Sequence, residues 1–336
     1  MTCLGINNPA FSRRTSYDVV VIDEASQILQ PISLGPLLLT NSKFVLVGDH
    51  NQLPPLLRAR DAIAKGNIAK LSSQSVEEEN VSLFERLRKA HPTTVISLKK
   101  QYRMAEDIMA LANELVYKGE LEFGNERTLK QELFVSNEKL NEIKKNCPAS
   151  SWLQSLVNLD VRTLFVDMDS ENLSHGCSVN GKTDIESKMN GKSKDAHGHT
   201  INLEELEVIL QAVGVLIKAG VQTKQISILA PFRIQVQLFR ERLQALSISE
   251  VSVFTTDQYQ GRDNDCVFVS FVRNLRAEYP GPLLDDWRRI NVAITRAKKK
   301  LVLVGSRLTL LRGSKCLKEM MKHFESRDAV VNAYYT

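Results

Sequence analysis

Five short and almost wholly apolar runs constrain the fold of this chain more than any other feature. They occupy residues 19–22, 44–47, 226–230, 267–272 and 301–305. Runs of this length are typical of strands that are buried on both faces, as in a parallel sheet covered by helices. The sequence therefore predicts a parallel sheet at its centre.

Two amphipathic segments predict helices near these runs. Residues 203–217 repeat leucine and valine at helical spacing, and Asn202 and Glu205 are spaced as an N-terminal cap with Gly220 beyond the end. Residues 315–326 repeat the pattern with leucine, methionine and phenylalanine. Strands that alternate with helices along the whole chain indicate an α/β fold.

Two polar segments interrupt this alternation, at about residues 124–150 and 168–200. The second is rich in glycine and serine and has few large apolar side chains, so we expect a mobile surface insertion there. No internal sequence repeat is present.

The composition narrows the classes of protein to which the chain can belong. Of its 336 residues 43% are apolar and 25% are charged, and no apolar run approaches the length of a membrane span. The N-terminus has no signal-peptide core, so we expect a protein that stays inside the cell. The net charge of +5 permits nucleic acid as a partner without requiring it.

The five cysteines are scattered and form no C-x-x-C pair. They are Cys3, Cys147, Cys177, Cys266 and Cys316. An odd number at wide spacing predicts reduced thiols instead of a disulfide framework.

Polar residues follow the first two apolar runs. Asp23 and Glu24 come directly after the first run, and Gly48 and Gln52 follow the second. Ligands bind at the carboxyl edge of open α/β sheets, where one carboxylate can hold Mg²⁺ and its neighbour can orient an attacking water. For an isolated Asp-Glu pair, a solvated loop is an equally good interpretation.

Aromatic and basic residues in the second half could serve the same kind of ligand. Tyr102 can stack on a base while the neighbouring Arg103 contacts phosphate, and Arg296 lies where a predicted helix feeds a strand. Considered alone, each arginine is predicted to be a surface residue. The three lysines at 298–300 read as a solvated basic run.

Five motifs in a fixed order favour a ligand-binding role for these residues over a solvated loop or surface position. DEAS, GDxxQLPP, QYRM, QGRD and NVAITRAK occur in that order, each beside the edge of a predicted strand. This set resembles superfamily I helicases of the senataxin and nonsense-decay group, over nearly the whole chain. Within the group, the likeness is greatest to the replication helicase/nucleases.

The resemblance implies a role for each matching residue around ATP. Asp23 would bind Mg²⁺, Glu24 would activate water and Gln52 would contact the γ-phosphate. Tyr102 would stack on adenine. The remaining residues implied at the nucleotide are the arginine fingers Arg103 and Arg296, with Gln260, Gly261 and Asp263 close by.

The resemblance also implies an architecture and partners. Residues 1–95 would be the end of a first RecA-like P-loop NTPase domain, truncated at its N-terminus, and residues 96–336 a second such domain. Closure on ATP would drive 5′–3′ translocation on single-stranded or flapped DNA, whose backbone would lie near Pro231, Thr255 and Thr256. Replication and single-strand-binding proteins are further partners that it implies, in the nucleus or the mitochondrion.

One expected element has no good counterpart. Only 22 residues precede Asp23, so we expect this sequence to lack the phosphate-binding loop that lies upstream in the family. The literal match Gly176–Thr183 lies in the polar insertion, without the strand and helix that such a loop needs. We likewise expect neither the iron-sulfur cluster nor the nuclease region of the helicase/nucleases in this sequence. A binding fragment without ATPase activity and an RNA helicase therefore stay open as alternatives.

The insertion also holds four candidate metal ligands, His175, Cys177, His197 and His199. Their H-x-C and H-x-H spacings differ from those of common structural zinc sites. We expect solvated side chains there.

Overall fold

The computed structural model describes residues 2–7, 16–56, 81–146, 152–169, 201–273 and 280–334. It divides into two compact units, Met1–Leu98 (unit 1) and Lys99–Thr336 (unit 2), and each is described by itself. No helix in these ranges is long and apolar enough to cross a membrane.

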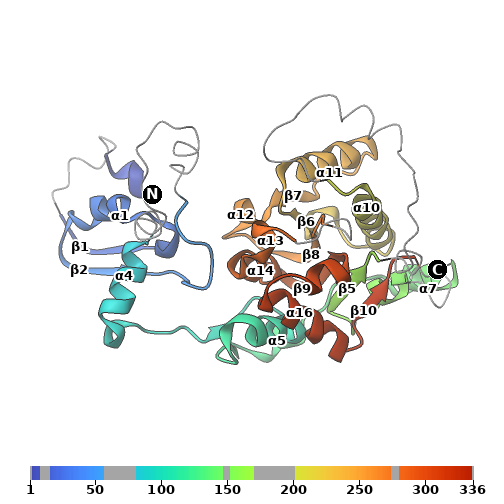
Figure 1. Cartoon of the computed structure of the whole chain (residues 1–336), viewed down its shortest axis with the longest axis horizontal. Helices are drawn as coiled ribbons and strands as arrows, with labels where there is room; N and C mark the ends of the chain where they lie inside the picture. The colour runs from blue at the N-terminus through green and yellow to red at the C-terminus, as the bar shows by residue number, and fades with distance from the viewer. Residues whose placement is uncertain are drawn as a thin grey trace. The chain divides into compact units, whose positions relative to one another are not determined.

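Unit 1 is built around two parallel strands, β1 (Tyr17–Ile22) and β2 (Thr40–Leu46), joined by α1 (Gln30–Leu37) (Figure 1). A short 3₁₀ helix, Cys3–Asn7, precedes β1, and α4 (Leu83–Ala90) begins at Ser82, whose hydroxyl accepts a bond from the Glu85 amide. Both apolar runs form strands as predicted.

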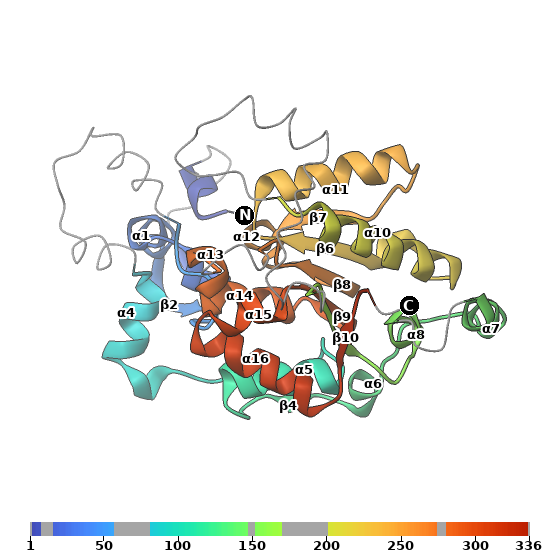
Figure 2. The same ribbon diagram turned by 45° about the vertical axis from the view of Figure 1, so that its right-hand side comes forward.

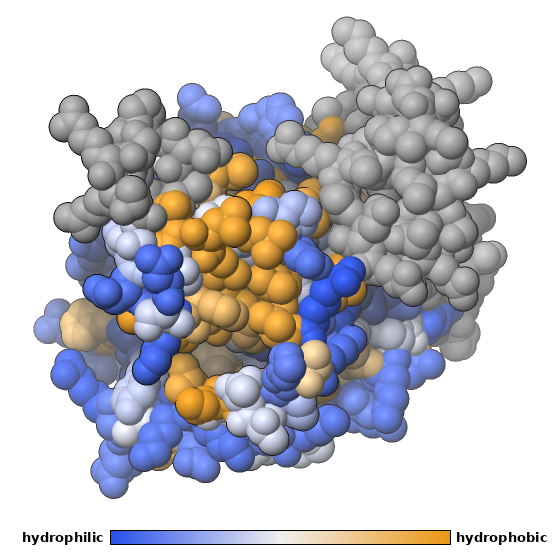
Figure 3. Space-filling model, turned by 90° about the vertical axis from the view of Figure 1, so that its left-hand side faces the viewer, coloured by the Kyte–Doolittle hydropathy of each residue, from blue (hydrophilic) through white to orange (hydrophobic). Residues whose placement is uncertain are grey.

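The predicted burial of these two strands is wrong. Val21 is 62% exposed, Val19 51%, Val45 47% and Phe44 46%. Among the residues described, α1 is the helix that packs most on this pair of strands, and the face that carries Val19, Val21 and Val45 stays largely exposed. A broad apolar area is accordingly visible in the space-filling view of Figure 3.

Unit 2 contains a six-stranded sheet in the order β10-β5-β9-β8-β6-β7, with every neighbouring pair parallel. The predicted α/β fold with a parallel sheet is therefore confirmed. Its strands are β5 (Thr163–Asp167), β6 (Ile226–Ala230), β7 (Ser252–Thr255), β8 (Asn264–Ser270), β9 (Ala297–Gly305) and β10 (Val330–Asn332).

Helices cover both faces of this sheet (Figure 2). One core lies under α8 (Trp152–Val157), α10 (Leu203–Lys218) and α11 (Arg233–Ala245). The opposite core lies under α5 (Glu106–Ala112), α14 (Trp287–Ile294) and α16 (Lys315–Ser326). Alternate residues of each strand enter alternate cores, so Leu303 faces one and Val302 the other, both fully buried.

The predicted helices agree closely with the structure. The Asn202 side chain accepts a bond from the Glu205 amide at the start of α10, and Gly220 beyond its end has a φ of +102°, which favours glycine. A one-turn π-helix, Asn113–Tyr117, continues α5. Short elements complete the unit: β3 (Lys100–Gln101), β4 (Glu122–Phe123), α6 (Glu126–Leu129), α12 (Thr256–Tyr259), α13 (Pro282–Asp285) and α15 (Arg307–Leu311).

The first polar segment is not the simple interruption that the sequence predicts. It contains α7 (Asn137–Asn146), and Leu133, Val135 and Ile143 join the hydrophobic core. Sparse apolar residues are enough here because they all face the same core. Most of the second polar segment, including Gly176–Thr183 and the four candidate zinc ligands, lies outside the described residues.

The cysteines in the described ranges are free thiols, as predicted for Cys3, Cys266 and Cys316. Cys147 and Cys177 lie outside those ranges. Burial raises the pKa of the Cys266 thiol to about 12, so it is a protonated core residue at neutral pH.

Candidate nucleotide and nucleic-acid sites

In unit 1, the polar residues after β1 and β2 gather at one edge of the strand pair. The strands run side by side with Ile22 opposite Leu46, so the following loops meet. The Ser26 hydroxyl accepts a bond from the Asp49 amide at 3.3 Å. At Gly48, a Cβ atom would lie 2.8 Å from the Ser26 nitrogen, so this close approach requires glycine.

Asp23 and Glu24 have different surroundings at this edge. Asp23 is exposed, and one of its oxygens accepts a bond from the Glu24 amide at 2.9 Å. Glu24 adopts a left-handed φ of 52° and accepts a 2.6 Å bond from Gln27 Nε2. A non-glycine residue in this region stores strain, which the neighbouring contacts must hold.

Asp23 fits the donor set that Mg²⁺ prefers. Mg²⁺ binds one or two carboxylates and keeps waters and substrate phosphates as its other ligands. No group of three acidic, histidine or cysteine side chains suited to a metal occurs among the described residues. A single exposed carboxylate would therefore hold the ion together with a nucleotide, and would not form a closed protein site.

Gln52 lies half-buried in the second loop. Its side-chain amide donates to Asp49 Oδ2 at 3.0 Å, and the other Asp49 oxygen accepts from the Asn51 amide at 2.9 Å. The structure thus brings Gln52 to the same edge as Asp23 and Glu24. Asp49, for which the sequence indicates no role, fixes the direction of the Gln52 side chain.

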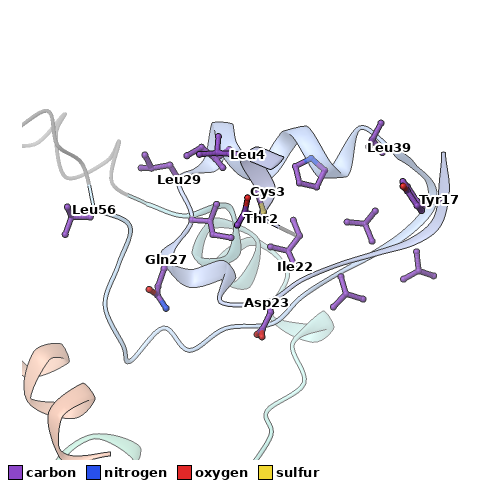
Figure 4. A pocket seen from close by; sticks show the side chains of 16 residues that line it. Thr2, Cys3, Leu4, Tyr17, Ile22, Asp23, Gln27, Leu29, Leu39 and Leu56 are labelled. Carbon is purple, nitrogen blue, oxygen red and sulfur yellow. The ribbon is translucent and has the colours of Figure 1, made fainter. Parts of the chain in front are cut away.

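A hollow of about 720 Å³ also opens in unit 1 (Figure 4). Apolar side chains, among them Val20, Ile28 and Leu29, form most of its wall, and Asp23 and Gln27 lie on its polar side. Apolar walls supply no hydrogen bonds for phosphate groups. The hollow is therefore a poor place for a phosphate group.

In unit 2, the QYRM motif forms a compact turn after β3. Gln101 Oε1 accepts bonds from the amides of Arg103 and Met104 at 2.8 and 2.7 Å. The Tyr102 ring is 64% exposed and lies against Gly124, where a Cβ atom would come within 2.1 Å of the ring. The ring therefore lies close to the Gly124 backbone, and most of the residue is exposed.

Arg103 forms an ion pair with Asp263. Its Nε donates to Asp263 Oδ2 at 3.1 Å, and Lys298 Nζ lies 2.6 Å from the other oxygen. Burial raises the pKa of Asp263, but Lys298 and Arg103 outweigh it, so the pKa stays below its ordinary value. Asp263 is thus a carboxylate shared by two cations, which the sequence did not indicate.

Arg296 is buried, with 1% of its surface exposed. Its guanidinium donates to the carbonyls of Val292 and Arg262 at 2.9 and 3.2 Å and to the Thr295 hydroxyl at 2.9 Å. The interpretation of Arg296 as a surface residue is therefore wrong. In this conformation its donors bind protein oxygens, so a phosphate would have to replace some of them.

The expectation that lysines 298–300 form a solvated run is wrong for Lys300, whereas Lys298 and Lys299 are partly exposed and held in ion pairs. Lys298 binds Asp263, and Lys299 binds Asp265 at 3.0 Å. Lys300 is 3% exposed, and its ammonium donates to the carbonyls of Asn158 and Val161 at 2.9 and 2.6 Å beyond the end of α8. Lys298 and Lys299 neutralise carboxylates, Lys300 donates to neutral carbonyls, and none of these acceptors is close to its lysine in sequence.

The predicted nucleic-acid contacts follow adjacent strands. Pro231 comes after β6 and is half-buried, and Thr255 ends β7 directly beside Ala230. Thr255 and Thr256 are 8% and 6% exposed, and the Thr255 side chain caps α12. Gln260 and Gly261 follow that helix, and Gly261 takes a φ of +79°.

Comparisons with known proteins agree with the motif order. Residues 79–308 match a protein family described as an AAA domain, and residues 1–60 match a second family with the same description. The chain is 39% identical over 93% of its length to the mouse DNA replication ATP-dependent helicase/nuclease DNA2, and 36% identical over 98% of its length to the human protein of that name. The resemblance found from the five motifs is confirmed.

These relatives are much longer than the chain. The match covers 27% of the mouse protein and 28% of the human protein. Among solved structures, the C-terminal domain of a "possible DNA helicase" from Lactobacillus plantarum WCFS1 aligns with 69% of this chain and 99% of that one, at 10% identity and a TM-score of 0.34. That score adds nothing to the fold, which the six-stranded parallel sheet establishes directly.

Proposed function

Because this chain belongs to the AAA domain family, we propose that it is part of the motor of an ATP-dependent DNA helicase that acts in DNA replication and repair. The observation that carries the proposal is the placement of its motifs. Asp23, Glu24 and Gln52 follow the ends of two neighbouring strands of unit 1, and in unit 2 Arg103, which follows Tyr102, pairs with Asp263. The proposal includes 5′–3′ translocation on single-stranded DNA and a place in the nucleus.

We infer nucleotide-binding roles for residues in each of the two units. Asp23 would hold Mg²⁺, and Glu24 would accept a proton from the attacking water. Tyr102 would stack on adenine, with Gln52, Gln260 and Gly261 beside the nucleotide. Mg²⁺ supplies charge stabilisation on the phosphates when it is bound.

Arg103 is the better placed of the two proposed arginine fingers. Its side chain is 36% exposed and paired with a carboxylate that could release it to phosphate. Arg296 would need to exchange the bonds that hold it inside unit 2. A variant of Arg296 must therefore be checked for folding before any loss of activity is assigned to catalysis.

Binding of a fluorescent ATP analogue in the presence of Mg²⁺ tests the metal assignment. Asp23→Asn should weaken the binding and remove its dependence on Mg²⁺. Asp18→Asn removes the same charge from an exposed position of the same strand and should leave binding unchanged. Equal binding by the two variants would exclude Asp23 as the metal ligand.

Tyr102 can be tested in the same assay. Tyr102→Ala should weaken nucleotide binding about tenfold, since stacking on an aromatic ring contributes about 1–3 kcal/mol per base. Tyr102→Phe keeps the ring and should bind as the unchanged chain does. A large loss in the phenylalanine variant would indicate a hydroxyl contact and contradict the stacking role.

Turnover separates the motor from the two alternatives. We expect the chain alone to hydrolyse ATP far below about 1 per second, because its described residues include no loop that cradles the β- and γ-phosphates. We expect it to bind single-stranded DNA more tightly than single-stranded RNA. DNA binding without any nucleotide binding would favour the inactive binding module, and a preference for RNA would favour an RNA helicase.

A further inference from the structure

Strand β8 leaves the sheet of unit 2 through a strained turn. Val272 has a φ of +68°, and the amide of Arg273 donates to the Phe271 carbonyl at 2.8 Å. A β-branched residue rarely occupies the left-handed region, and doing so costs on the order of 1–3 kcal/mol. The surrounding structure must therefore fix this turn.

Glu205 supplies the main restraint. It is fully buried, and its Oε2 accepts bonds from the Ser270 hydroxyl at 2.6 Å and the Val272 amide at 2.8 Å. Asn202 Nδ2 donates to Glu205 Oε1 and to the Val272 carbonyl, both at 3.1 Å. The amide and the carbonyl of Val272 are both held by side chains from the start of α10.

Gln235 extends the same network to α11. It is fully buried, its Oε1 accepts from the Asn202 amide at 3.0 Å and its Nε2 donates to the Asn202 carbonyl at 2.9 Å. The network therefore ties the start of α10 and the first turn of α11 to the end of β8. Buried polar networks in which each member is satisfied hold one conformation.

The turn directs Arg273 toward Phe232. The guanidinium carbon of Arg273 lies 5.5 Å from the centre of the Phe232 ring, within the range of a cation–π contact. Arg273 Nε is buried and has no hydrogen-bond partner among the described residues. Its side chain is partly exposed and has five donors and no acceptor, which suits the oxygens of a phosphodiester.

Arg273 and Phe232 lie at the same edge of the sheet as the predicted nucleic-acid contacts. Phe232 follows β6 and Arg273 follows β8, and these strands are neighbours with Leu229 opposite Val269. Thr255 ends β7 on the other side of β6. The loops after β8, β6 and β7 therefore lie in one row along the carboxyl edge of the sheet.

We propose that Arg273, stacked on Phe232, contacts the phosphodiester backbone of a single-stranded nucleic acid, and that Glu205 is the positioning residue that directs it. This inference rests on the proposed function, in which a single strand runs along this edge. To the contacts proposed at Pro231 and Thr255 it adds Arg273 and Phe232, together with Glu205, which positions Arg273.

Binding of a labelled single-stranded oligonucleotide at several salt concentrations tests the contact. Arg273→Ala should weaken binding about tenfold, the loss expected for a hydrogen bond to a charged group. It should also reduce the slope of log affinity against log salt by about 0.7, the value for one phosphate contact on a single strand.

Arg242→Ala is the matched control. Arg242 lies on α11, where it pairs with Glu207 at 2.6 Å, and its loss changes the net charge by the same amount. Its affinity and salt slope should stay near those of the unchanged chain. Equal effects of the two variants would show that only the net charge of the protein matters, and would overturn the inference.

The positioning role of Glu205 predicts a coupling between sites. Glu205→Ala removes the acceptor of the Val272 amide bond, so it should weaken binding in the native chain and have no further effect when combined with Arg273→Ala. Ser270→Ala, a milder change in the same network, should behave likewise. Additive losses would show that Glu205 does not act through Arg273.

The outcomes separate this inference from the proposed function. If the unchanged chain binds the strand and Arg273→Ala binds equally well, the inference fails and the proposed function stands. If the unchanged chain does not bind a single strand at all, both fail. Near-ultraviolet circular dichroism of each variant identifies those that have lost their fold.

Discussion

The two units place the same kind of sequence in opposite environments. Val302 in β9 is fully buried, whereas Val21 in β1 is 62% exposed, although both belong to short apolar runs in parallel strands. The sheet of unit 2 has helices on both faces, and the strand pair of unit 1 does not within the described residues. An apolar run thus predicts a strand, but the elements that pack on the strand determine how far its side chains are buried.

A matched pair of phenylalanines gives the largest expected difference between the units. Phe268→Ala in β8 should lower the free energy of unfolding of unit 2 by about 4 kcal/mol, because the side chain is fully buried between strand and helices. Phe44→Ala in β2 should cost under about 1 kcal/mol, because Phe44 is 46% exposed.

The two tryptophans make this measurement selective. Trp152 and Trp287 are the only tryptophans in the sequence, and both lie in unit 2. Their fluorescence during urea unfolding reports that unit alone, while far-ultraviolet circular dichroism reports both. Equal losses from the two substitutions would contradict the contrast in burial.

Lysines give a second, smaller contrast. Lys300→Met should cost about 3 kcal/mol, because the carbonyls that its ammonium binds would stay buried without a donor. Lys43→Met removes an exposed charge from β2 and should change stability by less than about 0.5 kcal/mol. A loss below 1 kcal/mol for Lys300→Met would show that water replaces the ammonium.

The pH dependence should have opposite signs in the two units. Burial raises the pKa of Glu205 to about 8. The hydrogen bonds from Ser270 and Val272 lower this pKa, and the charge of Glu204 raises it, but burial has the largest effect. The folded unit 2 therefore keeps a proton that the unfolded chain releases near pH 4.5. Its free energy of unfolding should fall as the pH rises from about 4.5 to about 8.

In unit 1, hydrogen bonding to Arg88 lowers the pKa of Glu85 to about 2. The free energy of unfolding of this unit should fall as the pH drops from about 4.5 to about 2. Urea unfolding at a series of pH values measures both slopes. Glu205→Gln should flatten the slope of unit 2 alone, and a slope that survives this substitution would assign it to another group.

The sequence predicts local structure well because the signals for it are local. The α16 repeat and the Asn202 cap are complete within a few residues, and both occur where the pattern places them. The motif order also placed Asp23 and Gln52 correctly after neighbouring strands. Whether these residues act on a nucleotide remains a prediction.

Contacts between segments that are distant in the sequence could not be predicted from it. Lys300 binds carbonyls near residue 158, and Glu205 binds Ser270, 65 residues away. Their partners lie in other elements, so neither residue differs locally from an ordinary lysine or helix-cap glutamate. The ion pair of Arg103 with Asp263 is hidden for the same reason, because 160 residues separate its members.

Amide hydrogen exchange of the whole chain, with and without single-stranded DNA, tests the account most directly. Without DNA, the amides of β6, β8 and β9 should exchange slowly and those of β1 and β2 quickly, in line with their burial. Added DNA should slow exchange in the segments around Phe232, Thr255 and Arg273. Protection by DNA confined to unit 1, with these three segments unchanged, would contradict the account.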